Sequence, residues 1–496
     1  MAFQAGGYKP PAEARVLRLD TLRSQPQRST MGREETRRTA MGMLAHWGGV
    51  LTRWTERWVP DSWVIAVVLT VIVASLAVTL GGASAVTVLA AWGRGLWTLL
   101  ALTMQFTLMM VVAYACAVSP PVKRLFGWLA SRPDPSQPRQ AILLMAVCST
   151  VTAWLNWAFS LVVTAAFLPF VVRANPQVDF RLLVASAYLG LGTVWHTGLS
   201  GSAPLIIATP DNFLITAGVL NELIPTTRTL FTPFNLVYAL IAGVLGVGIM
   251  MALVPPAEKT VCITNEQGAH LIGATPAKTR PIVMLPADWL EWWPGWSLIV
   301  GGAMLLYFLL QVRQVGLGAA WTIDNYNLLF FALGLLLHWY PKSFLHACEE
   351  GIRTTWGIVI QYPLYAGIFG LMTYTDLGKV LTSVFVSASV PRLFPVVVYI
   401  YSAALNYFIP SGGSKWIVEA SYLIPAGQAL GVSVPTVTLS YAYGDMTTNL
   451  LQPFWAIPIL TVAGLRFGDI MGYCLVVSGL MFVFNVFALL LIPLRL

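Results

Sequence analysis

The chain has 496 residues, of which 57% are hydrophobic and only 10% are charged. Soluble globular domains carry about 25% charged residues, so this composition excludes one large soluble core and indicates an all-α polytopic membrane protein. The net charge of +8 does not predict a nucleic-acid partner. Most of the excess of Lys and Arg lies in the N-terminal segment and in loops that the charge distribution places in the cytoplasm.

The N-terminal residues resemble neither a membrane span nor a signal peptide. Residues 1–43 are polar and rich in Arg, without an apolar segment, and are predicted to be a disordered cytoplasmic tail. Residues 44–60 alternate Trp, Leu and Arg, which favours a helix lying in the membrane interface. The five cysteines have no metal-ligand or redox spacing, so no metal site is predicted from them.

Apolar segments of about the length of a membrane span follow in chain order. In the first part of the chain they lie at 63–82, 96–118, 141–173, 181–209 and 233–254. The residues between the first three, 83–95 and 119–140, are predicted to be loops. Residues 257–292 contain too few apolar residues for a core and are predicted to be a cytoplasmic linker. In the second part the apolar segments lie at 294–312, 323–340, 356–374, 394–430, 434–464 and 470–493.

Four of the apolar segments are interrupted by polar residues. Two interruptions share a Leu-Asn-aromatic sequence, LNW at 155–157 and LNY at 405–407, and predict two re-entrant hairpins. The other two, at 192–202 and 443–449, predict two broken helices. Irregular backbone at membrane depth must line a cavity or be buried in protein, because lipid cannot hydrogen-bond its N–H and C=O groups. Such interruptions are typical of the substrate site of a secondary transporter.

The two halves of the chain contain similar sequences in the same order. MQFTL at 104–108 matches IQYPL at 360–364, just as the two Leu-Asn-aromatic sequences match each other. The Lys and Arg asymmetry of the loops places the N-terminus in the cytoplasm and the C-terminus in the periplasm. The sequence therefore predicts an inverted-repeat secondary transporter, with one transmembrane repeat in 44–256 and, after an extra crossing helix, a second, inverted repeat in 293–496.

The polar residues at the four interruptions are the candidates for the substrate site. A helix end within the membrane exposes N–H groups that suit an anion, or C=O groups that suit Na⁺ or a proton. The candidate substrate-binding residues are Asn156, His196, Thr197, Ser200, Gly201, Ser202, Asn406, Ser411, Gly412, Gly413, Ser414, Lys415, Thr448 and Asn449. A carboxylate within a membrane segment is a functional hypothesis by default, and the candidate ion-coupling residues are Asp445, Glu419 and Thr447.

Structural roles for the same residues stay open. Gly, Ser and Thr in membrane helices often serve packing, and Asn156 and Asn406 are also suited to capping the hairpin turns. Lys415 and Glu419 are four residues apart and can neutralise each other as a pair on one helix. His196 is equally suited to a hydrogen-bonded structural role and to titration near neutral pH.

No enzyme motif competes with the transporter interpretation. The chain has no Gly-rich phosphate-binding loop followed by Lys and Ser or Thr, so no ATP-driven motor is predicted. Ser411 and Ser414 flank two glycines, whereas a nucleophile elbow places Gly before and after the reactive Ser. We therefore expect no enzymatic activity.

Three blocks of sequence resemble the bacterial short-chain fatty acid transporter family, which belongs to the larger ion-transporter superfamily. They are WHTGLSGSAPL at 195–205, NYFIPSGGSKWIVEA at 406–420 and GDMTTNLLQPFWAIPIL at 444–460. The likeness extends over nearly the whole hydrophobic chain. Two residues depart from the family pattern, because Lys415 stands where an amide is expected and Glu419 stands where Gln is expected.

The resemblance implies uptake of short monocarboxylates such as butyrate or acetoacetate by a homodimer with a scaffold domain, a transport domain and an elevator-like movement. We therefore expect cation-coupled symport of short-chain fatty acids, a form of lipid transport, across the bacterial inner membrane. The carboxylate is expected to meet N–H groups and hydroxyls at the helix breaks, with the acyl tail against Trp157, Tyr407 and Trp416. Na⁺ or H⁺ is the expected coupling ion, and no other cofactor is predicted.

Three alternatives stay open. A passive facilitator or channel for organic anions shares the anion-binding helix ends but does not accumulate substrate against a gradient. A membrane sensor binds a ligand without moving it, although 257–292 is too short for a signalling domain. The third alternative is a carrier of a dicarboxylate or an inorganic ion. A dicarboxylate needs a second cationic partner, and Lys415 is the only basic side chain near the predicted site.

Overall fold

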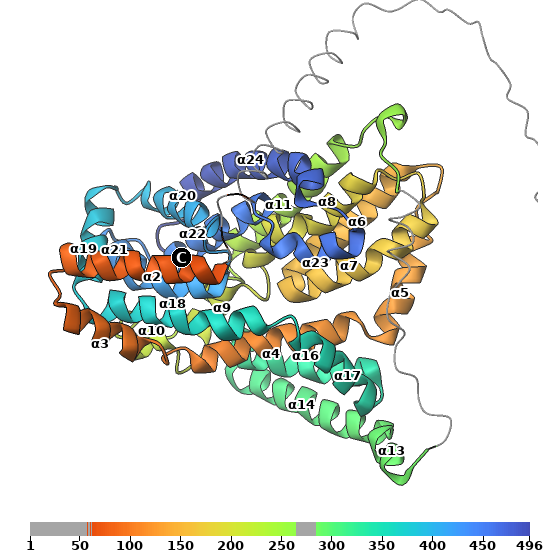
Figure 1. Ribbon diagram of the computed structural model, residues 1–496, viewed down its shortest axis with the longest axis horizontal. Coiled ribbons are helices and arrows are strands. Elements are labelled where there is room, and N and C mark those ends of the chain that lie inside the picture. Colours follow the sequence, from red (N-terminus) through yellow and green to blue (C-terminus); the bar gives the residue numbers. More distant parts are fainter. Residues whose placement is uncertain (1–56, 58–59, 61, 264–283) are drawn as a thin grey trace, which may run out of the picture. The chain divides into compact units, whose positions relative to one another are not determined.

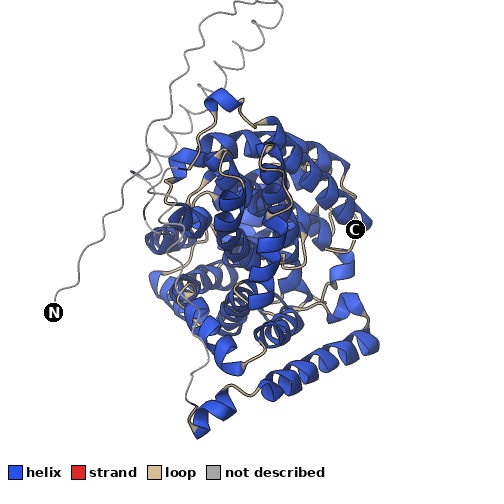
Figure 2. Cartoon of the chain, turned by 90° about the vertical axis from the view of Figure 1, so that its right-hand side faces the viewer, coloured by secondary structure: helices blue, strands red, loops and turns tan. Residues whose placement is uncertain are grey.

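The computed structural model describes Arg57, Pro60 and residues 62–263 and 284–496 (Figure 1). These residues form helices and loops, and no strand occurs among them (Figure 2). The predicted N-terminal tail, almost all of the predicted interfacial helix and the middle of the predicted linker lie outside the described residues. The predicted all-α class is confirmed.

Each predicted apolar segment contains one or more helices whose ends lie within a few residues of the prediction. In the first half they are α2 (Ser62–Thr79), α4 (Leu100–Ala117), α6 (Pro138–Leu155), α7 (Trp157–Ala174), α8 (Phe180–Thr193), α9 (Ser202–Ala208) and α11 (Pro233–Ala252). In the second half they are α14 (Pro294–Val315), α16 (Ile323–His338), α18 (Trp356–Tyr374), α20 (Phe394–Asn406), α21 (Gly412–Ala429), α22 (Val434–Thr447), α23 (Ile457–Ala463) and α24 (Phe467–Leu491). Runs of apolar residues form helices here because main-chain groups in apolar surroundings must bond within their own segment.

Four helices of 11 or 12 residues lie between the apolar segments: α3 (Ala85–Gly95), α5 (Pro120–Ala130), α17 (Pro341–Ile352) and α19 (Leu377–Ser387). The prediction of loops at 83–95 and 119–140 is therefore wrong. These helices are short and amphipathic, so a search for long, uniformly apolar segments misses them. Short helical turns connect the other elements: α10 (Phe213–Thr216), α13 (Pro286–Glu291), α15 (Leu317–Ala320), η2 (Thr226–Arg228) and η3 (Ala257–Lys259).

The four predicted interruptions are helix breaks in the structure. Asn156 alone separates α6 from α7, with an extended backbone at φ −158° and ψ 123°. Residues 407–411 separate α20 from α21, and Pro410 prevents a continuous helix there because it lacks an N–H and clashes with the preceding turn. The break after α8 contains η1 (Trp195–Thr197), and the break after α22 contains η4 (Thr448–Leu451) and η5 (Phe454–Ala456).

The helices of the two halves recur in one order. Helices α2 to α9 and α11 correspond one by one to α16 to α24. Corresponding helices have similar lengths: α5 and α19 have 11 residues each, α8 and α22 have 14 each, and α9 and α23 have 7 each. The sequence similarity between the halves is therefore matched by a recurrence of helices, including the short amphipathic ones.

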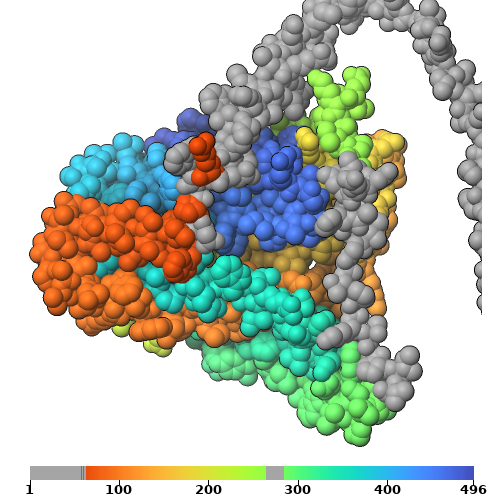
Figure 3. Space-filling model, viewed as in Figure 1, coloured from red at the N-terminus to blue at the C-terminus, as the bar shows by residue number. Residues whose placement is uncertain are grey.

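The two halves also contact each other reciprocally. Helices α2 and α3 pack against α18, and their counterparts α16 and α17 pack against α4. In the same way α7 packs against α23, and α21 packs against α9. In the space-filling view the orange helices α2 and α3 lie against the teal α18 (Figure 3). Reciprocal contacts of this kind are those that a twofold relation between two similar units produces.

The described residues include six helical stretches that are long and apolar enough to cross a membrane: Leu100–Ala117, Trp157–Ala174, Phe180–Thr216, Pro233–Ala252, Pro286–Val315 and Phe467–Leu491. Large apolar side chains on these stretches remain exposed, for example Leu240 at 68% and Leu309 at 61%. Apolar surface of this extent is suited to contact with lipid rather than with water. The chain is therefore a multi-pass membrane protein.

Gly190→Ala is expected to destabilise the protein by about 1–3 kcal/mol, because Gly190 lies where α8 crosses α6. A Cβ at Gly190 would lie 2.2 Å from the main-chain oxygen of Ser149. The Ser149 hydroxyl fixes the same crossing, since it accepts from the N–H of Gly190 and donates to the oxygen of Ala187, both at 2.9 Å. Thermal unfolding measures the change, and Gly248→Ala on α11, where a Cβ meets nothing within 4 Å, is the matched control. Equal unfolding temperatures for the two variants would contradict this account.

Candidate functional site

All four helix breaks contribute to one cavity. Its volume is about 30 Å³, which is room for about two water molecules. The lining residues are Phe106, Trp157, Leu191, Trp195, Ser202, Ile358, Tyr362, Ser411, Gly412, Gly413, Asn449 and Trp455. Six of these residues were predicted: Trp157 for the acyl-chain wall, and Ser202, Ser411, Gly412, Gly413 and Asn449 for substrate binding. The cavity therefore brings together predicted residues from all four breaks.

The N-terminus of α21 opens into this cavity. Ser411 is the N-cap residue, and its hydroxyl accepts from a main-chain N–H of the first turn at 3.4 Å. The N–H groups of Gly412 and Gly413 have no hydrogen-bond partner among the described residues. A Cβ at Gly413 would lie 3.1 Å from the ring of Phe106 and from the hydroxyl oxygen of Tyr362. Glycine therefore keeps this helix end open, and a helix N-terminus with free N–H groups suits an anion.

Two tryptophans add unpaired donors at the same cavity. The indole N–H groups of Trp157 and Trp195 are buried and have no hydrogen-bond partner among the described residues. Their ring centroids lie 6.3 Å apart in an edge-to-face arrangement, and the ring of Trp455 lies 5.1 Å from that of Trp157. Because a buried indole N–H usually has a partner, two unpaired ones favour a ligand with acceptor oxygens.

Apolar side chains form the rest of the wall. Phe106 of α4 and Tyr362 of α18 contact each other edge to face, with ring centroids 6.1 Å apart. Neither residue was predicted for the site. Tyr407 and Trp416, which were predicted to line it beside Trp157, do not line the cavity. The cavity wall therefore comes partly from uninterrupted helices, whose matching sequences MQFTL and IQYPL were singled out as a repeat and not as part of the site.

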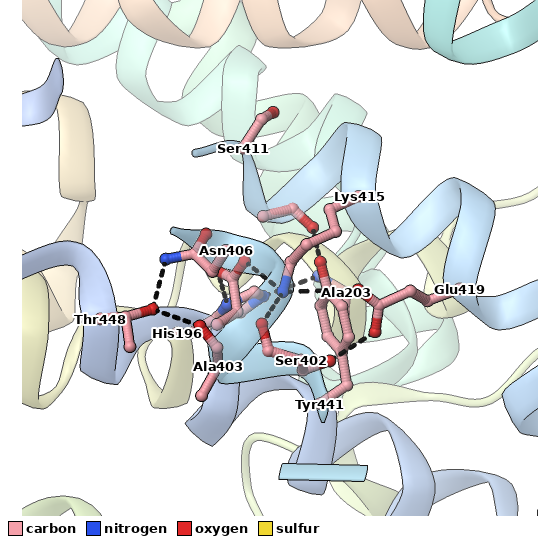
Figure 4. Close-up of polar contacts among 12 residues, drawn as sticks. His196, Ala203, Ser402, Ala403, Asn406, Ser411, Lys415, Glu419, Tyr441 and Thr448 are labelled. Carbon is pink, nitrogen blue, oxygen red and sulfur yellow. Dashed lines mark hydrogen bonds and ion pairs between the residues drawn. The ribbon is translucent and has the colours of Figure 1, made fainter. Parts of the chain in front are cut away.

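Four ionisable side chains form a cluster behind the N-terminus of α21 (Figure 4). Lys415, Glu419, Asp445 and His196 all have fully buried side chains. The Nζ of Lys415 lies 3.1 Å from Oδ1 of Asp445 and 3.6 Å from Oε1 of Glu419, and donates to the main-chain oxygen of Ser402 at 2.8 Å. The predicted pair of Lys415 with Glu419 is present, but the nearer carboxylate comes from α22. The cluster therefore ties α21 to α22.

His196 is held in one tautomer by its two neighbours. Its Nε2 accepts from the main-chain N–H of Ala203 at 3.1 Å, so this nitrogen carries no proton. Its Nδ1 therefore carries the proton and donates to Oδ2 of Asp445 at 2.9 Å. The imidazole is neutral in this arrangement and orients Asp445. His196 does not line the cavity, and the predicted contact of His196 with a substrate stays a prediction.

Ser402 and Tyr441 complete the cluster and were not predicted. The Ser402 hydroxyl donates a short hydrogen bond to Oε2 of Glu419. The Tyr441 hydroxyl donates to the main-chain oxygen of Gly412 at 2.7 Å, and its ring faces Nζ of Lys415 at 4.5 Å. Each lies one helical turn before a predicted residue on the same helix face, and this spacing is the sequence signal that could have found them.

Asn406 ties the break after α20 to the break after α22. Its Nδ2 donates to Oγ1 of Thr448 at 3.1 Å and to Oδ1 of Asn449 at 2.8 Å. Asn449 in turn donates to the main-chain oxygen of Leu191 at 3.2 Å. Only Asn449 of these three predicted residues lines the cavity. Asn406 and Thr448 therefore have structural contacts, and a substrate contact of either residue stays a prediction.

The N-terminus of α7 is capped within the protein. The Oδ1 of Asn156 accepts from the N–H of Phe159 at 2.9 Å, and the Ser200 hydroxyl accepts from the N–H of Trp157 at 3.0 Å. These bonds use donors that a substrate would otherwise meet. Substrate contacts of Asn156 and Ser200 stay predictions, and the capping role of Asn156 is present.

The remaining predicted residues differ in their positions. Ser202 lines the cavity, and Ser414 is buried with no hydrogen-bond partner for its hydroxyl among the described residues. Thr197 and Thr447 donate to main-chain oxygens of their own segments at 2.6 and 2.7 Å. Gly201 allows a tight turn, since a Cβ there would lie 2.6 Å from a main-chain oxygen of η1. An ion-coupling role of Thr447 stays a prediction.

The sequence of this chain matches known proteins. A family model described as "Short chain fatty acid transporter" matches residues 43–494. The chain belongs to this family. It is 36% identical over 444 residues to an Escherichia coli protein named "Putative short-chain fatty acid transporter", over 89% of this chain and 99% of that protein. A Haemophilus influenzae protein of the same name is 32% identical over 439 residues, 87% of this chain and 96% of its own length.

Two solved structures share the fold. The YdaH transporter of Alcanivorax borkumensis, described as having an unusual topology, has a TM-score of 0.55 at 15% identity and matches 87% of this chain and 98% of its own. MtrF of Neisseria gonorrhoeae, described within a class of antimetabolite efflux pumps, has a TM-score of 0.50 at 13% identity, over 89% of this chain and 96% of its own. The predicted family is thus confirmed, and membership of a transporter family implies a protein that is not an enzyme.

Proposed function

We propose that the protein is a secondary active transporter of short-chain monocarboxylates, such as butyrate or acetoacetate, in the bacterial inner membrane. The main support is the N-terminus of α21, whose free N–H groups at Gly412 and Gly413 open into a cavity walled by aromatic rings. A helix N-terminus attracts a carboxylate, and an apolar wall suits a short acyl chain. The indole N–H groups of Trp157 and Trp195 offer two further donors to the carboxylate oxygens.

The cavity has to widen to hold such a substrate. A volume of about 30 Å³ holds about two water molecules, which is less than a carboxylate with several carbons needs. The lining breaks belong to two sets of helices with reciprocal contacts, and movement of such repeats is a common basis of alternating access. We infer that the repeats are inverted in the membrane, that the α6–α7 and α20–α21 hairpins are re-entrant, and that an elevator-like movement occurs within a homodimer. The N-terminus is then cytoplasmic and the C-terminus periplasmic.

The buried ionisable cluster is the proposed coupling site. It lies directly behind the α21 N-terminus, since a Cβ at Gly412 would lie 2.7 Å from Oδ2 of Asp445. Tyr441 bonds to the main-chain oxygen of Gly412 and also faces the Lys415 ammonium. A change of charge in the cluster therefore acts on the helix end that meets the substrate. Symport with Na⁺ or H⁺ is the mechanism that this arrangement supports.

A monocarboxylate fits the donors better than a dicarboxylate does. A second carboxylate would need a second cationic or N–H-rich site. Lys415 was the only basic side chain predicted near the site that could provide it. Its ammonium group faces the oxygens of Ser402, Glu419 and Asp445, and Lys415 does not line the cavity. The ammonium is therefore engaged within the protein and is separated from the substrate.

Uptake of radiolabelled butyrate into proteoliposomes tests this function. With an inward gradient of Na⁺ or H⁺, we expect accumulation above the external concentration, competition by unlabelled acetoacetate, and no accumulation in liposomes without protein. Equilibration without accumulation would instead indicate a passive facilitator. Absence of flux, together with binding of a different anion, would reject the monocarboxylate substrate.

Trp157→Phe and Trp195→Phe are each expected to raise the butyrate concentration for half-maximal uptake by about 10-fold or more, because each removes one donor and keeps an aromatic ring. A hydrogen bond to a charged group contributes about 1.5–3 kcal/mol. Trp416→Phe is the matched control, since Trp416 also has a buried, unpaired indole N–H among the described residues but does not line the cavity. Unchanged half-saturation in both cavity variants would contradict the proposed carboxylate site.

A further inference from the structure

The ammonium group of Lys415 lies in a shell of oxygen atoms from three helices (Figure 4). The main-chain oxygen of Ser402 on α20 lies 2.8 Å from Nζ, Oδ1 of Asp445 on α22 lies at 3.1 Å, and Oε1 of Glu419 on α21 lies at 3.6 Å. The ring of Tyr441 faces the same nitrogen at 4.5 Å. Carbonyl and carboxylate oxygens are the ligands that hard cations prefer, and transporters bind Na⁺ with main-chain carbonyls near helix breaks.

These contacts hold the ammonium group within the protein. Nζ of Lys415 donates one hydrogen bond, to the main-chain oxygen of Ser402, and forms ion pairs with Asp445 and Glu419 at 3.1 and 3.6 Å. The side chain has no exposed surface and does not line the cavity. The charge of Lys415 therefore acts within the protein, between α20, α21 and α22.

The surroundings of Asp445 explain why a cation is needed at this place. One of its oxygens faces Lys415, and the other accepts from Nδ1 of His196. His196 is neutral because its Nε2 accepts from the N–H of Ala203. Lys415 is thus the group that balances the charge of Asp445, and a buried carboxylate without a cation carries a large desolvation cost.

We propose that Lys415 is a tethered cation that occupies the position between α20, α21 and α22 where an alkali metal ion would otherwise bind. The lysine then determines ion specificity. Because Na⁺ cannot enter this position within the proposed coupling site, H⁺ is the coupling ion of the two and uptake does not require Na⁺. The statement that uptake does not require Na⁺ rests on the proposed transport function. The statement that Lys415 occupies the position of a metal ion does not. Removing the ammonium and leaving its space empty should convert this position into a Na⁺ site.

Thermal unfolding of the purified full-length protein in NaCl and in choline chloride tests the ion position. Lys415→Ala leaves the oxygen shell empty. Na⁺, at a concentration well above its Kd for this shell, should therefore raise the unfolding temperature of the variant by roughly 3–5 °C. Methylammonium chloride, which supplies the lost head group, should stabilise the same variant. Lys415→Met fills the space without charge, so neither it nor the wild type should respond to Na⁺. Lys379→Ala, which removes an exposed lysine of α19, is the control.

The outcomes separate this proposal from the proposed function. An equal Na⁺ response in wild type and Lys415→Ala, or no response in a folded Lys415→Ala, overturns the proposal. If Lys415→Ala does not fold, butyrate uptake by the wild type tests the proposal instead. Uptake that is unchanged when choline replaces Na⁺ at constant pH supports the proposal, and a requirement for Na⁺ overturns it. If the wild type takes up no butyrate, the proposed transport function is rejected. The proposed cation position is still tested, because the unfolding temperature of the wild type should not respond to Na⁺.

Discussion

Asp445→Ala is expected to abolish butyrate uptake and to lower the free energy of unfolding by about 3 kcal/mol or more. The substitution removes the carboxylate that lies 3.1 Å from Nζ of Lys415 and accepts from His196 at 2.9 Å. Lys415 then keeps the longer contact with Glu419, its bond to a main-chain oxygen and the facing ring of Tyr441. Breaking a buried ion pair at one side is costly because the remaining charge loses its partner without regaining water. Chemical unfolding and proteoliposome uptake measure the two effects.

A double variant separates the ion pair from the other contacts of each residue. Asp445→Ala combined with Lys415→Met leaves no unpaired ammonium, so its loss of stability should be smaller than the sum of the two single losses by about 1–3 kcal/mol. Asp376→Ala is the matched control, because Asp376 pairs with Lys379 at 2.7 Å on the surface and such pairs contribute little. Strictly additive losses would show that this pair does not couple α21 to α22.

The helix breaks could be predicted from sequence because their signals act locally. Asn156 caps α7 through its own side chain, and Pro410 ends the preceding helix through its missing N–H and its ring. Both effects reach no further than one helical turn. The same reasoning gave the long apolar helices, since their main-chain bonds are also made within one segment.

The partners of Lys415 show where local reasoning ends. The four-residue spacing predicted the contact with Glu419, which the structure has at 3.6 Å. The nearer partner, Asp445, lies on a different helix, and no spacing rule relates it to Lys415. That pair depends on how α21 and α22 pack, which many distant contacts decide together. Only the structure could show that three helices surround one ammonium group.

Two rings of the aromatic wall were missed for a related reason. Trp157 was selected because it follows Asn156 at a break, whereas Phe106 and Tyr362 lie within uninterrupted helices. An aromatic residue in an apolar helix has the same local pattern whether it faces lipid, another helix or a cavity. The assignment of these two rings to the cavity depends on α4 and α18 meeting the α21 N-terminus.

Gly413→Val is expected to lower butyrate uptake at subsaturating concentration by roughly 10- to 100-fold. Its Cβ would lie 3.1 Å from the ring of Phe106 and from the hydroxyl of Tyr362, and its two methyl groups would enter a cavity of about 30 Å³. The side chain would also crowd the free N–H groups proposed to meet the carboxylate. Gly413→Ala adds only the Cβ, so it should have a smaller effect in the same direction. Initial rates in proteoliposomes with equal amounts of protein measure both.

Gly479→Val on α24 is the matched control for this substitution. It places the same branched side chain in a membrane helix at a position where a Cβ meets nothing within 4 Å. The change in helix propensity from glycine to valine is therefore shared by the two variants, whereas the filled cavity belongs to Gly413→Val alone. An equal loss of uptake in both would assign the effect to the helix. Wild-type uptake by Gly413→Val would mean that the carboxylate does not approach the N-terminus of α21, and the binding site would have to lie at another of the breaks.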